Sequence, residues 1–130
     1  MTIQETLTKY LVGRRITAAE SGTLTLDDGT TLRLYESGYD CCAAAYGKWK
    51  ILDPDRLEAA ITHVEYESDG YKDFHTRATT CRITILHNQN KIALGAGSAN
   101  AGNGGYYFSV LSLEVTVDGT TVHDEEVISA

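Results

Sequence analysis

The strongest constraint on the fold of this chain is a set of apolar side chains that recur at every second residue. The clearest run lies near the end of the chain, where Leu111, Leu113, Val115 and Val117 alternate with more polar residues. Successive side chains of a strand point to opposite faces, so this period is typical of a strand with one buried face. The same alternation occurs in three shorter segments: Leu24/Leu26, Leu32/Leu34 and Ile83/Ile85. The pattern predicts a mainly β fold.

The first segment of the chain has a different period and predicts a helix. One helical stripe would hold the apolar side chains of Ile3, Leu7, Tyr10 and Leu11. Thr2 and Glu5 have the spacing of a capping box, and Gly13 suits the left-handed residue that ends a helix. We expect this helix to lie across the sheet.

A hairpin follows, and its register can be derived from the positions of the leucines. A two-residue turn at Asp28–Gly29 would place the two leucine sets on opposite faces of the sheet. A three-residue turn over residues 27–29 pairs Leu24 with Leu32 and keeps all the leucines on one face. We therefore predict the longer turn, with Gly29 in the left-handed conformation. An earlier strand over residues 15–20 is expected to join this sheet.

Shorter elements are expected in the middle of the chain. The Asp53–Pro54 step is typical of a helix start, so we predict a short helix that ends near Ala60. A short strand is expected before it, over residues 48–52. β-Branched residues after it predict a strand over residues 61–66, and a polar loop then follows over residues 68–73.

A second hairpin is expected between residues 78 and 94. The buried faces of its strands agree if Ile85 pairs with Leu94 and His87 pairs with Ile92.

Residues 95–105 contain five glycines and two asparagines. No helix is expected after them and no Gly-Lys-Ser/Thr step occurs, so the segment lacks the context of a phosphate-binding loop. We predict a flexible or tightly turning connection between strands. After the long strand, Asp118–Gly119 is expected to form a turn and residues 121–122 to begin a last short strand. The acidic end, residues 123–130, is expected to fray.

These elements together predict an α+β, mainly β fold. We expect a curved antiparallel sheet or a barrel-like sheet, with the N-terminal helix and one short helix packed on it. No repeat and no linker occurs in the sequence, so residues 1–130 are expected to form a single domain.

The adjacent pair Cys41–Cys42 is the most distinctive chemical feature. Adjacent cysteines rarely form a disulfide, because the small ring strains the peptide bond. A metal site with the histidines lacks the usual ligand spacing, and a neighbouring Asp40 raises the pKa of a thiol. We therefore expect Cys41, Cys42 and Cys81 to be reduced and to serve packing. We expect no cofactor, no metal and no catalytic residue, since no motif of a serine hydrolase or other catalytic triad occurs.

Charge and cysteine content exclude several classes of function. The formal net charge is −7, and an acidic surface repels a phosphate backbone, so general nucleic-acid binding is not expected. The sequence has no run of about 18 apolar residues that would span a membrane. Its first residues lack the apolar core of a signal peptide. With three cysteines, these features predict a location in the cytoplasm.

Several short motifs occur in an order that resembles a known family. The order comprises residues 11–16, the leucine hairpin, Asp40-Cys41-Cys42, Trp49, and Asn103-Gly104-Gly105-Tyr106-Tyr107. It resembles an uncharacterised family of small proteins from actinobacteria and their bacteriophages, a domain of unknown function, over residues 11–117. The resemblance implies a phage-encoded product and carries no activity. It implies that the binding residues are Asp40, Cys41, Cys42, Trp49, Asn103, Tyr106 and Tyr107.

Two classes of function remain open at this point. The first is a non-catalytic binding module that binds a host protein. The alternative is a small-molecule binding or sequestering protein, or a small enzyme, built from Cys41, Cys42, Trp49 and the glycine-rich segment. A deep pocket lined by Cys42, Trp49 and Tyr107 would favour the alternative, whereas a flat tyrosine-bearing face or an open strand edge would favour a partner protein. Because exposed sheet edges often pair, a homodimer is a further expectation.

Overall fold

The computed structural model of the chain describes residues 2–72, 77–102, 105 and 107–130. Within this range the chain forms nine strands, one α-helix and one 3-10 turn. In order they are α1 (Ile3–Leu11), β1 (Ile16–Glu20), β2 (Thr23–Leu26), β3 (Thr31–Tyr39), β4 (Ala45–Ile51), η1 (Pro54–Arg56), β5 (His63–Lys72), β6 (Arg77–His87), β7 (Asn90–Asn100), β8 (Ser109–Val117) and β9 (Thr120–Ser129).

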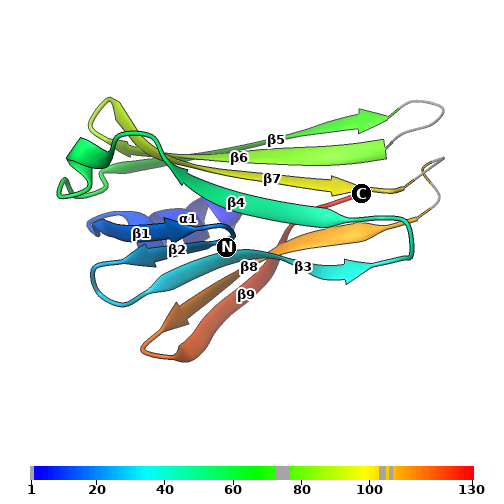
Figure 1. Cartoon of the computed structure of the whole chain (residues 1–130), viewed down its shortest axis with the longest axis horizontal. Helices are drawn as coiled ribbons and strands as arrows, with labels where there is room; N and C mark the ends of the chain where they lie inside the picture. The colour runs from blue at the N-terminus through cyan, green and yellow to red at the C-terminus, as the bar shows by residue number, and fades with distance from the viewer. Residues whose placement is uncertain (1, 73–76, 103–104, 106) are drawn as a thin grey trace.

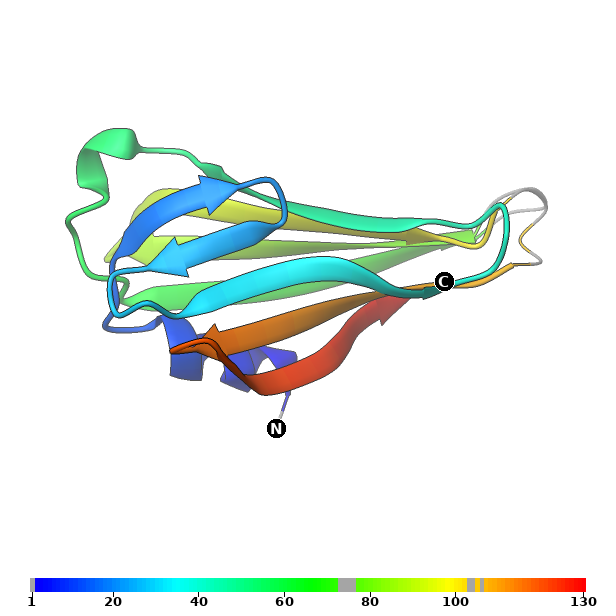
Figure 2. The same cartoon turned by 60° about the horizontal axis from the view of Figure 1, so that its bottom comes forward.

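The strands form two antiparallel sheets that are stacked face to face (Figure 1). One sheet has the strand order β1-β2-β3-β8-β9 and the other has the order β4-β7-β6-β5. Seen from the second direction, the first sheet lies in front of the second, and α1 lies at the lower edge of the two layers (Figure 2). The predicted mainly β fold with an N-terminal helix is confirmed, but the sheets do not close into a barrel. One buried cluster joins both sheets and α1, and its members include Leu7, Leu11, Leu24, Leu32, Ile83, Ile85, Ile92, Leu111 and Leu113.

The predicted helix and its caps are confirmed. The Thr2 hydroxyl accepts a hydrogen bond from the Glu5 amide at 3.1 Å, and the Glu5 carboxylate accepts one from the Thr2 amide at 3.4 Å. Leu7 and Leu11 are fully buried, so the apolar stripe of α1 faces the core. Gly13 has a φ of +88° just after the helix, as a left-handed stop requires.

The register of the first hairpin is also confirmed. Leu24 pairs with Leu32, and Gly29 has a φ of +86°. Strand β1 pairs with β2 and extends the sheet by one strand, as expected from residues 15–20.

The predicted short helix after Asp53 is wrong. Only the 3-10 turn η1 forms there, the Asp53 side chain makes no cap hydrogen bond, and none of the three residues is buried. A single turn without an apolar face has nothing to pack on a sheet, so it ends where the chain turns towards β5.

The predicted polar loop over residues 68–73 is wrong as far as residue 72, and residue 73 lies outside the described residues. Strand β5 continues to Lys72, and Ser68 and Asp69 pair with Cys81 and Thr80 of β6. Their side chains are exposed because β5 lies at the edge of its sheet. Polar residues are tolerated in such a strand, and composition alone therefore mistook it for a loop.

The predicted register between β6 and β7 is wrong by one residue at Ile85 and by two residues at His87. Ile85 pairs with Ala93 instead of Leu94. His87 then pairs with Asn90, one residue further from the expected partner, because an irregularity interrupts the ladder between Ile85 and Leu86. A bulge of this kind inserts one residue on one strand and shifts every pair beyond it.

The predicted connection over residues 95–105 is wrong for its first six residues. They belong to β7, which pairs with β4 on one side and with β6 on the other. A Cβ atom added to Gly95 would lie 2.7 Å from the Trp49 ring, so the missing side chain makes room for the indole. The glycines of this segment thus serve close packing inside a sheet.

The predicted fraying of residues 123–130 is wrong as well. Asp118 and Gly119 form the expected turn, with φ values of +51° and +79°, but β9 then runs to Ser129. The backbones of Ser109 and Ala130 exchange two hydrogen bonds of 3.0 and 3.1 Å, which hold the end of the chain against β8.

Candidate functional site

The structure brings together some of the residues expected to form a site. Asp40, Cys41 and Cys42 follow β3, and Tyr107 precedes β8, at the end of the sandwich where β3 meets β4 (Figure 1). The Asp40 amide donates to the Phe108 carbonyl at 2.9 Å, which joins the two segments. Asn103 and Tyr106 lie outside the described residues.

Cys41 and Cys42 occupy the two central positions of a tight turn. The Ala43 amide donates to the Asp40 carbonyl at 3.2 Å, and Cys42 has a φ of +76°. A positive φ at the second central position is the mark of a type II turn, where glycine is the usual residue. Both thiols are exposed, and their sulfur atoms lie 3.0 Å apart. The predicted packing role is therefore wrong for Cys41 and Cys42, whereas Cys81 is buried; all three cysteines are free thiols.

The electrostatics of the pair oppose a nucleophilic role for Cys41. The hydrogen bond with Cys42, followed by the charge of Cys42, raises the pKa of the Cys41 thiol, and Asp40 adds to this rise. Nucleophilic cysteines need the opposite shift, because the thiolate is the reactive form.

Two neighbouring residues fix the conformation of this turn. The side-chain oxygen of Asn100 accepts hydrogen bonds from the amides of Ala44 and Gly102, at 3.2 and 3.1 Å. A Cβ atom on Gly102 would lie 2.5 Å from the Cys42 carbonyl oxygen and 2.7 Å from the Tyr107 ring. Sequence reasoning missed Asn100, although a polar side chain that ends a strand of small residues was a usable signal.

Trp49 does not join this group. Its side chain is buried among core residues, and its indole nitrogen donates to the Gly22 carbonyl at 3.0 Å. Trp49 therefore offers no surface to a ligand beside Cys42.

A second candidate site lies along the edge of β5. The Gln4 side chain of α1 donates to the Val64 carbonyl at 2.7 Å and accepts from the Tyr66 amide at 2.9 Å. These backbone groups point away from β6. Because the backbone N–H and C=O groups of every second residue in a strand point to the same side, those of Ser68 and Gly70 also point away from β6. Among the described residues, no hydrogen bond engages the backbone of Ser68 or Gly70 on that side. Gln4 thus covers half of the edge of β5 and leaves the other half open.

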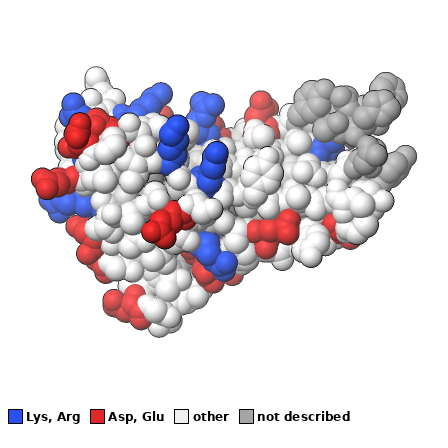
Figure 3. All heavy atoms as spheres, in the orientation of Figure 1, with Lys and Arg blue, Asp and Glu red and all other residues white. Residues whose placement is uncertain are grey.

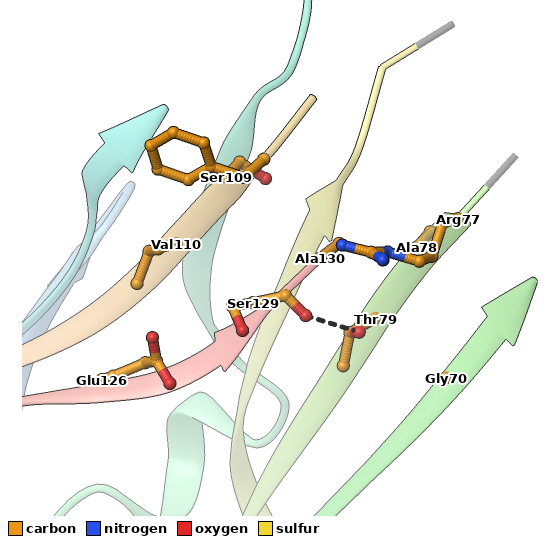
Figure 4. A pocket seen from close by; sticks show the side chains of 10 residues that line it. Gly70, Arg77, Ala78, Thr79, Ser109, Val110, Glu126, Ser129 and Ala130 are labelled. Carbon is orange, nitrogen blue, oxygen red and sulfur yellow. Dashed lines mark hydrogen bonds between the residues drawn. The ribbon is translucent and has the colours of Figure 1, made fainter. Parts of the chain in front are cut away.

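A groove of about 630 Å³ lies beside this open half (Figure 4). Gly70, Ala78 and Thr79 line one wall, and Val110, Glu126 and Ser129 line the other. The Thr79 hydroxyl donates to the Ser129 carbonyl at 2.8 Å, so the two sheets are tied together there. Nothing lies within 4 Å of a Cβ atom added to Gly70, so there is free space beside this residue.

The two edges of this sheet differ in charge. Basic side chains gather over β4, whose Lys48 and Lys50 are exposed (Figure 3). Three exposed side chains on β5 are acidic instead, namely Glu65, Glu67 and Asp69, and Glu67 forms an ion pair of 3.6 Å with Arg82 of β6. Glu126 adds a further exposed carboxylate on the far wall of the groove. Over residues 63–70, the edge of β5 therefore carries an excess of acidic side chains.

The described residues hold no group of three or more metal-ligating side chains. Over the same part of the chain, no helix is long and apolar enough to cross a membrane.

Comparison with known proteins gives a family but no activity. No curated protein and no solved structure matches the chain. Residues 9–113 match the model of a protein family of unknown function, which confirms the expectation of an uncharacterised domain family. The chain belongs to this family, the domain of unknown function DUF7448.

Proposed function

We propose that this protein is a non-catalytic binding module that takes an extended segment of a partner protein as an added strand along β5. The observation that carries the proposal is the Gln4 side chain. Its amide group makes the hydrogen bonds to the backbone of Val64 and Tyr66 that a neighbouring strand would make, and it reaches no further along β5. Addition of a strand to an exposed edge supplies backbone hydrogen bonds as affinity and side-chain pockets as specificity.

The two faces of β5 define the chemistry of the segment. Glu67 and Asp69 point outward, so residues beside them on an added strand would gain from a positive charge. Gly70 lines the groove, and a small apolar side chain such as valine on the added strand would find space beside it. The partner segment is therefore an extended stretch in which basic and small apolar residues alternate.

The same charges disfavour a second copy of this chain as the occupant. Pairing β5 with β5 would bring the acidic side chains of two edges together, and each copy has a formal net charge of −7. Like charges on neighbouring strands are destabilising. A partner protein with a basic segment is thus preferred over the homodimer, and for a phage-encoded product this partner would be a host protein.

The alternative, a small-molecule site or enzyme, has less geometric support. It required Trp49 and the glycine-rich segment beside Cys42, yet Trp49 is buried, residues 95–100 are part of β7, and only the Gly102 end of the segment packs against Cys42. An open strand edge beside a groove is the arrangement that favours a partner protein.

The test uses a fluorescent ten-residue peptide in which lysine alternates with valine. Fluorescence anisotropy measures its binding, and amide hydrogen exchange reports whether Ser68 and Gly70 become protected. A peptide with glutamate in place of lysine controls for charge, and a peptide with separate lysine and valine blocks controls for alternation. We expect binding of the alternating basic peptide alone, with protection of both amides.

Three variants locate the binding. Ser68→Pro removes the edge amide and is expected to weaken binding up to about tenfold, the upper end of the net value of one hydrogen bond. Asp69→Lys is expected to weaken it about fivefold. Glu20→Lys makes the same charge change on β1, at the edge of the other sheet, and should leave binding nearly unchanged. The proposal would be refuted if the Ser68→Pro variant bound the peptide as tightly as the parent protein, or if none of the peptides bound.

A further inference from the structure

The two exposed thiols at the loop end of the sandwich have a geometry that the sequence does not explain. Side chains of adjacent residues point to opposite faces in a strand, so two adjacent sulfurs normally diverge. Here the left-handed Cys42, with φ +76°, brings its sulfur to 3.0 Å from the sulfur of Cys41. A residue with a side chain is penalised in that conformation. A strained conformation retained at an exposed site is a reason to look for a function.

The distance between the sulfurs selects among the partners that two thiols can share. A disulfide needs about 2.05 Å between sulfurs and a Cα separation above about 4.4 Å, whereas adjacent residues are about 3.8 Å apart. With metal–thiolate bonds of about 2.3 Å, a linear centre needs about 4.6 Å and a tetrahedral centre about 3.8 Å. A pyramidal centre with bond angles near 90° needs about 3.3 Å, the value nearest to the 3.0 Å of this pair.

We propose that Cys41 and Cys42 form a chelating site for trivalent arsenic. In the reaction with an organoarsenic(III) dihydroxide, two As–O bonds break and two As–S bonds form. The two thiol protons leave with the two hydroxides as two molecules of water. No electron is transferred, so the step needs neither an oxidant nor a reductant.

The surroundings of the pair favour a centre with two protein ligands. Within the described part of the chain no third cysteine, histidine or carboxylate completes a metal-binding group, as a zinc site would require. Trivalent arsenic that carries one organic group needs only the two thiols. Both sulfurs are exposed, and the hydrogen bonds to Asn100 hold the loop behind them, so the pair is accessible and ordered before it binds.

The experiment uses residues 1–130 and phenylarsine oxide, a reagent that becomes the dihydroxide in water. Mass spectrometry under native conditions is expected to show one phenylarsenic group per chain. A chromogenic disulfide reagent should detect two reactive thiols before binding and none after it, because Cys81 is buried. Competition with a small dithiol gives the affinity.

Controls separate the site from general thiol chemistry. Cys41→Ser and Cys42→Ser are each expected to weaken binding at least about a hundredfold, because one As–S bond and the chelate ring are lost. Cys81→Ser should bind as the parent protein does. The folded chain is expected to bind at least about tenfold more tightly than the same chain in urea, since folding fixes the two sulfurs in place.

Three results would overturn the proposal. One is equal affinity of the folded and unfolded chains, which would mean that the turn contributes nothing. Another is retention of binding by either single serine variant. The third is a purified protein that lacks two hydrogens in mass and takes up no arsenic, which would identify the pair as a disulfide. The open edge of β5 is a different site, so these results leave the binding of peptides untouched.

Discussion

Replacement of Gly102 by alanine is expected to destabilise the loop end of the sandwich far more than the same change at Gly105. Both glycines have a φ of +72°, so the added side chain meets the same backbone penalty at both positions. Their surroundings differ. A Cβ atom on Gly102 would lie 2.5 Å from the Cys42 carbonyl oxygen, whereas on Gly105 its nearest neighbour would be the Arg77 Cβ at 3.8 Å.

The magnitude follows from these two contributions. A left-handed residue with a side chain costs about 1–2 kcal/mol, and the lower chain entropy of unfolded alanine offsets about 0.4–1 kcal/mol of this. Overlap with packed neighbours costs a further amount of about 1–3 kcal/mol. Gly105→Ala should therefore lower the free energy of unfolding by about 1 kcal/mol, and Gly102→Ala by about 2–4 kcal/mol.

Urea unfolding followed by the fluorescence of Trp49 measures both values, because the indole is buried in the folded chain. The difference between the variants isolates the contact between Gly102 and Cys42. Equal destabilisation by the two substitutions would refute the reasoning, since it would mean that the two loops do not touch as described. A second measurement is the reactivity of Cys41 and Cys42, which should change in Gly102→Ala and stay constant in Gly105→Ala.

Three other substitutions and one titration test the fold. Ser68→Pro should cost less than about 1 kcal/mol in urea unfolding, because its amide lies on the open edge, whereas Glu67→Pro removes an amide that faces β6 and should cost about 3 kcal/mol. Gly29→Ala should cost about 1 kcal/mol through its positive φ, and an unchanged urea midpoint would count against the bulged turn. Burial raises the pKa of the Cys81 thiol from 9.0 to about 11, so the folded chain keeps a proton that the unfolded chain releases. The free energy of unfolding keeps its full value below pH 9. It falls as pH rises towards 11, by at most about 3 kcal/mol. Cys81→Ala should flatten this decline, and an equally steep decline in the variant would disprove the assignment.

Local signals were sufficient where a few neighbouring residues determine the conformation. The capping box of Thr2 and Glu5 and the left-handed Gly29 act within one turn of chain, and each appears in the structure as expected. The pairing of Leu24 with Leu32 was predictable because the turn length and the buried face allow only one register.

Predictions from local sequence failed where a residue distant in the sequence determines the conformation. Residues 68–72 have the composition of a loop, and they form a strand because β6 offers them a pairing partner. The edge site was not visible in the sequence at all, since the bonds from Gln4 to β5 join residues about sixty positions apart. The sequence did single out Asp40, Cys41 and Cys42, but not the left-handed turn that presents the two thiols.

The position of Trp49 shows what kind of sequence signal would have separated a core residue from a binding residue. Lys48 and Lys50 flank it, and a strand places these two side chains on the face opposite to the indole. Two lysines are rarely buried together, so the strand pattern alone turns Trp49 inward. The cross-strand partner of Trp49 is Gly95, whose missing side chain leaves the space that the ring fills. Size complementarity between paired strands thus accounts for both the tryptophan and the glycine, and neither residue then needs a ligand to explain it.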